Sequence, residues 1–177
     1  MYLESIKTEY KRYKKVTEGA VMQVKDSDLT KVLGSEENSI SITMCHIAGN
    51  LKSRFTDFLT SDGEKPWRKR DQEFIQKDFN REELLKFWEE GWTVLFNTLD
   101  TLEEDDLGIT VQIRGYDWIV IDAINRSISH IAYHVGQIVL LARIFVGYEW
   151  KYLSVPKGMT EEYNKNPTIE KEPKMPQ

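Results

Sequence analysis

Four stretches of this chain repeat apolar side chains at the spacing of an α-helix, over residues 3–24, 39–60, 80–102 and 117–147. Apolar residues that recur at intervals of three and four predict a helix with one face turned toward a core. Helices of this length can pack side by side around one shared core. The sequence therefore predicts an all-α fold, a four-helix bundle.

The connection between the third and fourth helices is longer than is usual in such a bundle. Within it, residues 108–113 are rich in β-branched side chains, which predicts a short strand or an extended crossover that turns at Gly115. Residues 1–160 are expected to form a single domain. Residues 161–177, with prolines and alternating charges, are expected to form a mobile tail.

Charge and composition exclude several classes of protein. The chain carries 24 basic and 29 acidic residues, a net charge of −5, which argues against a nucleic-acid surface. Cys45 is the only cysteine, so no intrachain disulfide can form. The first residues lack the apolar core of a signal peptide, and the longest apolar-rich stretch, residues 138–146, is too short to span a bilayer. We expect a cytoplasmic protein without a membrane partner.

All three histidines fall on predicted helices, His46 on the second and His130 and His134 on the fourth. The spacing of four residues places His130 and His134 one turn apart on the same helix face, where both can reach one ion. A third imidazole from another helix would give three protein ligands and leave a coordination position open. An open position is what separates a catalytic metal site from a closed structural one.

The helical wheel places these histidines differently on the two helices. His130 and His134 are predicted in the middle of the inward face of the fourth helix, beside small residues that leave space for an ion. His46 is predicted beside the apolar face of the second helix, on a polar line. The two lines are Ile119, Ala123, Ser127, His130, His134, Gln137 and Leu141 on the fourth helix, and His46, Asn50, Ser53 and Asp57 on the second.

A second interpretation of these histidines is a hydrogen-bonded core, and spacing alone favours neither interpretation. Two adjacent imidazoles that face a core are costly unless their ring nitrogens have partners, which favours a metal. Cys45, next to His46, is predicted to be a small core residue. The basic residues 65–70 are predicted to form a solvated loop rather than an anion site, although Trp67 within them is a candidate for covering a ligand.

Two motifs together resemble the DinB-like superfamily of bacterial metalloenzymes. They are M-C-H-I-A-G-N-L at residues 44–51 and S-I-S-H-I-A-Y-H-V-G-Q-I at residues 127–138. Residues 49–71 and 153–159 are similar to one subfamily of unknown function. The resemblance implies a four-helix bundle in which His46, His130 and His134 hold a divalent ion, and it implies a homodimer.

The resemblance also implies a chemistry, because better-known relatives transfer a low-molecular-weight thiol such as bacillithiol to an electrophile. Zinc fits three imidazoles best, and nickel, iron or manganese are alternatives. Two other functions stay open: a metal-dependent hydrolase, and a non-catalytic dimeric bundle that binds a small ligand or partner. No catalytic residue is assigned. Candidates for contacts behind the metal or with a small-molecule substrate are Asn50, Arg54, Asp57, Trp67, Arg68 and Gln137.

Overall fold

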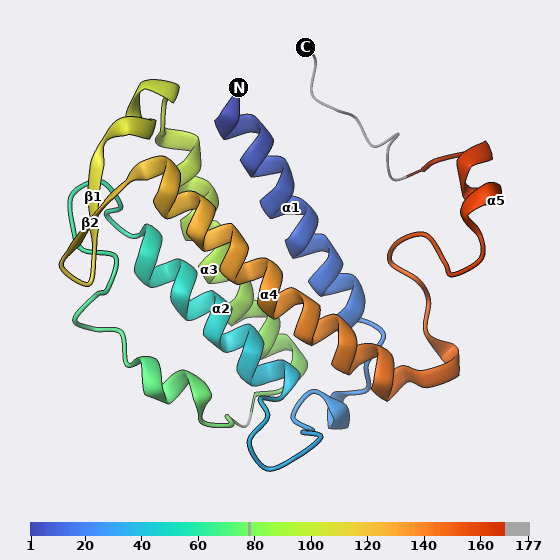
Figure 1. Cartoon of the computed structure of the whole chain (residues 1–177). Coiled ribbons are helices and arrows are strands. Elements are labelled where there is room, and N and C mark those ends of the chain that lie inside the picture. Colours follow the sequence, from blue (N-terminus) through green and yellow to red (C-terminus); the bar gives the residue numbers. More distant parts are fainter. Residues whose placement is uncertain (78, 169–177) are drawn as a thin grey trace.

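The computed structural model describes residues 1–77 and 79–168, and this part of the chain is mostly helical. In Figure 1 the long helices lie side by side, with the two-stranded sheet at one end of them. The main elements in chain order are α1 (Tyr2–Val21), α2 (Ile40–Phe55), α3 (Arg81–Thr101), β1 (Thr110–Ile113), β2 (Tyr116–Ile119), α4 (Val120–Val146) and α5 (Thr160–Lys165). Short 3₁₀ helices connect them: η1 (Asp26–Asp28), η2 (Arg70–Phe74), η3 (Glu104–Gly108) and η4 (Gly147–Glu149).

The second helix begins where the sequence predicts and ends earlier. Ser39 caps α2, because its Oγ accepts a hydrogen bond from the backbone N–H of Ile42 at 3.2 Å. The helix ends at Phe55, whereas the periodicity predicts that it continues to residue 60. Asp57 has φ 48°, a left-handed conformation that stops helix propagation. Phe58, which follows the end of α2, is still buried, and this explains why the apolar periodicity continues past the helix.

The third helix confirms its predicted start. Asn80 Oδ1 accepts from the backbone N–H of Glu83 at 2.9 Å, and Glu83 Oε2 accepts from the backbone N–H of Asn80 at 3.0 Å. This reciprocal capping box satisfies backbone donors that the helix itself leaves without partners. The predicted apolar stripe of this helix is fully buried: Leu84, Trp88, Trp92, Leu95, Leu99 and Leu102.

The long connection before the fourth helix is a β-hairpin. β1 and β2 pair antiparallel, with Ile113 opposite Tyr116, so the turn consists of Arg114 and Gly115. Both turn residues have positive φ, 56° and 76°, as a tight two-residue hairpin requires. Because β2 uses residues that the periodicity assigns to the helix, α4 starts at Val120 rather than near residue 117. Its predicted end is confirmed, since Gly147 follows the last helical residue with φ 63°.

The core is centred on α2. Every α2 residue from Ile40 to Gly49 is buried, so this helix is covered on all sides rather than along one stripe. Its closest neighbour is α3, where Gly91 lies directly against the backbone of Ala48. α4 covers another side of α2 and also packs on α1 (Figure 1).

The basic run after α2 is not the solvated loop that the sequence predicts. Lys65 is 6% exposed, and its Nζ donates to Ser61 Oγ at 2.6 Å. The side chain of Arg68 is 3% exposed. Trp67 between them is exposed, as are Lys69 and Arg70. The prediction is therefore wrong for the two cations that fold inward.

The mobile tail that the sequence predicts can be compared with the structure only over its first residues. Residues 160–165 form α5, so the start of this segment has regular structure. Residues 169–177 lie outside the described part of the chain.

One described helix is long and apolar enough to cross a membrane by length and composition. It is the stretch Val120–Glu149, which is longer than the apolar run recognised in the sequence. A single helix of this kind is weak evidence, because the core helix of a soluble protein passes the same test.

Candidate metal centre

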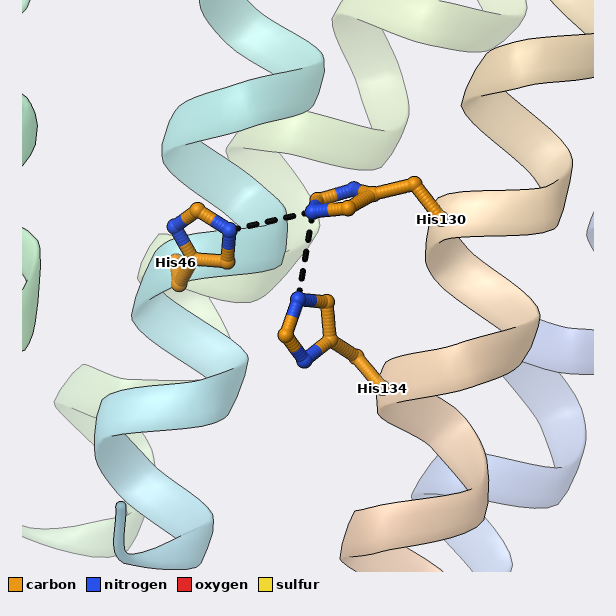
Figure 2. Close-up of side chains that lie close together, drawn as sticks. All are labelled: His46, His130 and His134. Carbon is orange, nitrogen blue, oxygen red and sulfur yellow. Dashed lines mark hydrogen bonds between the residues drawn. The ribbon is translucent and has the colours of Figure 1, made fainter. Parts of the chain in front are cut away.

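The three histidines meet in the space between α2 and α4. Figure 2 shows His46 on α2 facing His130 and His134, which lie one turn apart on α4. His46 Nε2 and His134 Nε2 each lie 3.1 Å from His130 Nε2. One ring nitrogen from each histidine lies within 4.8 Å of the others. Residues from two helices far apart in sequence thus form one compact nitrogen cluster.

Hydrogen bonds on the far side of two rings set their orientation. His46 Nδ1 lies 2.9 Å from Glu73 Oε2, and His134 Nδ1 lies 2.7 Å from Gln137 Oε1. A carboxylate and an amide oxygen only accept, so each Nδ1 carries the hydrogen and donates it. The Nε2 atoms of these two rings are then free acceptors directed at His130.

This arrangement has more acceptors than hydrogens. Only His130 Nε2 can supply a hydrogen to the cluster, and it faces two lone pairs. One cation bound to all three nitrogens satisfies every lone pair. Zinc–nitrogen bonds of about 2.0–2.1 Å in a tetrahedral site place ligand nitrogens about 3.3 Å apart. The two separations of 3.1 Å are close to that value, so the group can hold a metal ion.

The surroundings favour the neutral form of His130 and His134. Burial, the neighbouring rings of His134 and His46, and the charges of Arg68 and Arg54 lower the pKa of His130 to about 3. Burial and His46 also lower the pKa of His134, against the hydrogen bond to Gln137, which raises it. Neutral imidazole is the form that binds metals. The site is therefore ready for a cation near neutral pH.

Glu73 is a site residue that the sequence analysis missed. It lies on η2, is 7% exposed, and accepts from Arg68 Nε and Nη2, both at 2.8 Å, in a bidentate pair. Burial raises the pKa of Glu73, but the hydrogen bonds from Arg68 and His46 together hold it below its usual value. The chain Arg68–Glu73–His46 thus supports one ligand from behind. No local motif marks Glu73, since nothing in its neighbourhood predicts a contact with α2.

Glu73 also explains a glycine on α2. A Cβ at Gly49 would lie 2.4 Å from Glu73 Oε1. The absence of a side chain there lets the carboxylate approach the helix that carries His46.

The remaining candidates divide into two groups. Gln137 contacts His134 directly, and Arg68 reaches the site through Glu73. Asn50 is half-buried one turn after His46, and Arg54 is buried one turn further on. Asp57 is exposed beyond the end of α2, and Trp67 is 53% exposed. The structure places neither of these two in contact with the histidine cluster among the described residues.

The histidines are buried to a different extent than the helical wheel predicts. His130 and His134 are half-buried at the edge of the buried face of α4, which runs through Ala123, Ser127, Ile131 and Ile138. Ile119, predicted on the inward line, is 40% exposed because it belongs to β2. His46, predicted beside the core, is 4% exposed because α2 is surrounded. The site therefore lies where the core meets the surface.

These features define a class, a mostly helical protein with a three-histidine cluster able to hold a metal ion between two of its helices. The chain belongs to the family described as "Protein of unknown function (DUF1572)", whose model matches residues 1–159. Comparison with curated proteins and with solved structures finds no significant match.

Proposed function

We propose that this protein is a metal-dependent enzyme built on a four-helix bundle, with one divalent ion bound by His46, His130 and His134. The observation that carries the proposal is the convergence of three Nε2 atoms, two of them oriented by Glu73 and Gln137. Three neutral protein ligands leave a coordination position open for a reactant. A structural site would be expected to supply a fourth side chain, and the cluster of described residues contains only three.

The reaction that we propose is transfer of a low-molecular-weight thiol to an electrophile, in line with the DinB-like resemblance. A divalent ion held by these three histidines would lower the pKa of a bound thiol or water and so would supply a nucleophile near neutral pH. His46, His130 and His134 hold the centre, and Glu73 keeps His46 in the tautomer that presents Nε2. Zinc is the metal that we favour for this set of ligands.

The thiol must come from outside the chain. Cys45 is the only cysteine, it is 3% exposed, and burial raises its pKa to about 11. A buried thiol with a raised pKa is a poor nucleophile. The reaction therefore needs a small thiol as co-substrate.

We further propose that the enzyme is a cytoplasmic homodimer. Light scattering during gel filtration measures the molar mass in solution and so tests the dimer directly.

The first experiment is elemental analysis of untagged protein. We expect close to one zinc per chain in the wild type and almost none in His46→Ala or His130→Ala. Lys52→Ala is the matched control, because Lys52 also lies on α2 but its side chain is 42% exposed and pairs with Glu90, and this variant should retain the metal. Wild-type protein that takes up no zinc, nickel, iron or manganese would refute the proposed centre.

The second experiment tests the chemistry of the loaded protein. Consumption of a small thiol in the presence of an electrophile, lost in His130→Ala while the helical circular dichroism signal is kept, supports thiol transfer. Hydrolysis without thiol consumption would identify the protein as a hydrolase instead. Metal that raises the melting temperature but supports neither reaction would identify a non-catalytic, structural ion.

A further inference from the structure

Arg54 is a buried cation for which no ion pair is found among the described residues. It lies on α2, two turns after His46, and the residue as a whole is only 9% exposed. Its Nη1 atom is buried and has no hydrogen-bond partner among the described residues. Burying a guanidinium without an anion is costly, so such a group is uncommon in a folded chain unless something pairs with it.

Two neighbouring cations have carboxylate partners, whereas Arg54 forms no ion pair among the described residues. Arg68 forms its bidentate pair with Glu73, and Arg114 Nε lies 3.2 Å from Glu64 Oε2. Burial, together with the positive charges of Arg126 and Arg68, lowers the pKa of Arg54 to about 10, while Glu64 acts in the opposite direction. The environment of Arg54 is therefore one in which an added negative charge would be stabilised.

The loop after α2 holds the guanidinium in place. A Cβ at Gly63 would lie 3.0 Å from both Cδ and Nη1 of Arg54, so the backbone of the loop rests directly against the side chain. Gly63 is itself fixed, because its N–H donates to the Gln112 carbonyl at 2.8 Å and its carbonyl accepts from Ser53 Oγ at 2.8 Å. The cationic group is thus oriented before any ligand arrives, which reduces the entropy lost on binding.

Arg54 lies on the side of α2 that carries the histidine cluster. His46, Asn50 and Arg54 follow one another at intervals of four residues, and residues so spaced share one side of a helix. The charge of Arg54 also acts on His130 of the facing helix. For an anionic group on a small molecule at the metal centre, Arg54 is therefore the nearest cation on α2 that forms no ion pair among the described residues.

We propose that Arg54 is a binding residue for a carboxylate of the small molecule that this centre acts on. The proposal rests on the proposed function for the identity of the ligand, but the anion subsite itself needs no metal. A planar guanidinium matches the geometry of a carboxylate with two parallel hydrogen bonds. One uncompensated cation also matches a single negative charge. A phosphate dianion is disfavoured because it would bring a second negative charge that this one guanidinium does not balance.

The test is titration of metal-free, ¹⁵N-labelled protein with acetate at constant ionic strength, followed through backbone amide resonances. We expect saturable shifts in the wild type, centred on residues near Arg54 and Gly63, and an affinity at least tenfold lower in Arg54→Gln. Arg126→Gln is the matched control, because the charge of Arg126 also acts on Arg54. Arg126 is itself exposed, and its guanidinium lies 5.0 Å from the centre of the Trp118 ring. This variant should bind acetate within about twofold of the wild type.

Stability provides a second readout. Removing an unpaired buried charge should leave the melting temperature of Arg54→Gln unchanged or higher, whereas loss of a structural contact would lower it. If Arg54→Gln does not fold, Arg54→Lys keeps the charge without the planar fork and should bind acetate severalfold more weakly than the wild type.

Several outcomes overturn the proposal. They are a wild type that shows no saturable shift, equal weakening in the Arg54 and Arg126 variants, and tighter binding of inorganic phosphate than of acetate. Because metal is absent throughout, these outcomes are independent of the elemental analysis. A protein that binds acetate but no metal would refute the proposed centre and leave Arg54 as an anion site.

Discussion

At the residue scale, the site depends on a carboxylate that lies far from the histidines in sequence. Glu73 and His46 are separated by 27 positions, and the hydrogen bond between them determines which nitrogen of His46 faces the cluster. Arg68 in turn determines the position of Glu73 through two bonds. The geometry of one ligand atom therefore depends on three side chains.

This relation predicts the effect of Glu73→Gln. The amide keeps an oxygen for His46 Nδ1 but loses the charge that pairs with Arg68. We expect zinc affinity to fall roughly 10- to 100-fold, the usual range for such outer contacts, measured by competition with a chromophoric chelator. Glu64→Gln is the control, because Glu64 pairs with Arg114 and lies 3.7 Å from Arg68 without touching a histidine. Unchanged affinity in Glu73→Gln would contradict a role for this carboxylate.

At the element scale, the distance between α2 and α3 is set by a single glycine. A Cβ at Gly91 would lie 2.7 Å from both the Cα and the carbonyl oxygen of Ala48, which are backbone atoms and cannot rotate away. The two helices would have to separate or tilt to admit a methyl group. Because α2 carries His46, such a shift would also move one ligand.

Gly91→Ala is accordingly expected to destabilise the fold. We expect a loss of about 1–3 kcal/mol in the free energy of unfolding, measured with urea. Gly136→Ala is the matched control, since Gly136 is also helical and a Cβ there meets nothing within 4 Å. That change should stabilise α4 by up to about 1 kcal/mol through helix propensity. Equal effects of the two substitutions would show that close packing at Gly91 does not matter.

The hairpin is tied to the loop after α2 by one carboxylate. Asp62 accepts hydrogen bonds from the backbone N–H groups of Glu64, Arg114 and Gly115, at 2.7, 2.8 and 2.6 Å. Burial acts to raise the pKa of Asp62, but these three bonds together lower it below its ordinary value of 3.8. The ionised side chain is thus the form that holds the turn in place.

Asp62→Ala should therefore destabilise the protein in a pH-dependent way. A group whose pKa is lower in the folded state stabilises the fold above its unfolded pKa, and this contribution disappears as pH falls through the folded pKa. We expect the variant to lose about 1–3 kcal/mol at pH 7, and the difference to shrink below about pH 4. Urea unfolding at several pH values measures it. A difference that is independent of pH would mean that the charge of Asp62 contributes nothing.

At the scale of the whole molecule, the histidine cluster joins α2 to α4. One ion bound between α2 and α4 would link the N-terminal and C-terminal halves of the chain (Figure 1). A ligand that binds only the folded state stabilises it in proportion to the logarithm of its excess over the dissociation constant. A metal bound at this cluster would therefore act on global stability as well as on the site.

We expect zinc in 100-fold excess over its dissociation constant to stabilise the wild type by about 2.7 kcal/mol and so raise the melting temperature by several degrees. A chelator should reverse the increase. His46→Ala should show no increase, while Glu64→Gln should respond like the wild type. An equal increase in His46→Ala would place the bound zinc elsewhere.

Local signals in the sequence determined the boundaries and buried faces that were predicted well. The Asn80–Glu83 capping box, the apolar stripe of α3 and the glycine after α4 all depend on residues within a few positions of one another. Such short-range interactions can be recognised from spacing, because the geometry of a helix is the same wherever it occurs. The three histidines became candidates for the same reason.

Contacts between distant segments decided the rest. Pairing of β2 with β1 shortened α4 at its start, and the surrounding helices buried His46 deeper than the wheel indicates. Glu73 and Arg68 acquired their roles only when η2 packed against α2, while Nη1 of Arg54 is buried without a hydrogen-bond partner in the described part of the chain. The sequence by itself determined which segments are helices and which side chains could bind a metal. The tertiary structure decided which charges are paired, because pairing depends on distances across the fold that no local pattern encodes.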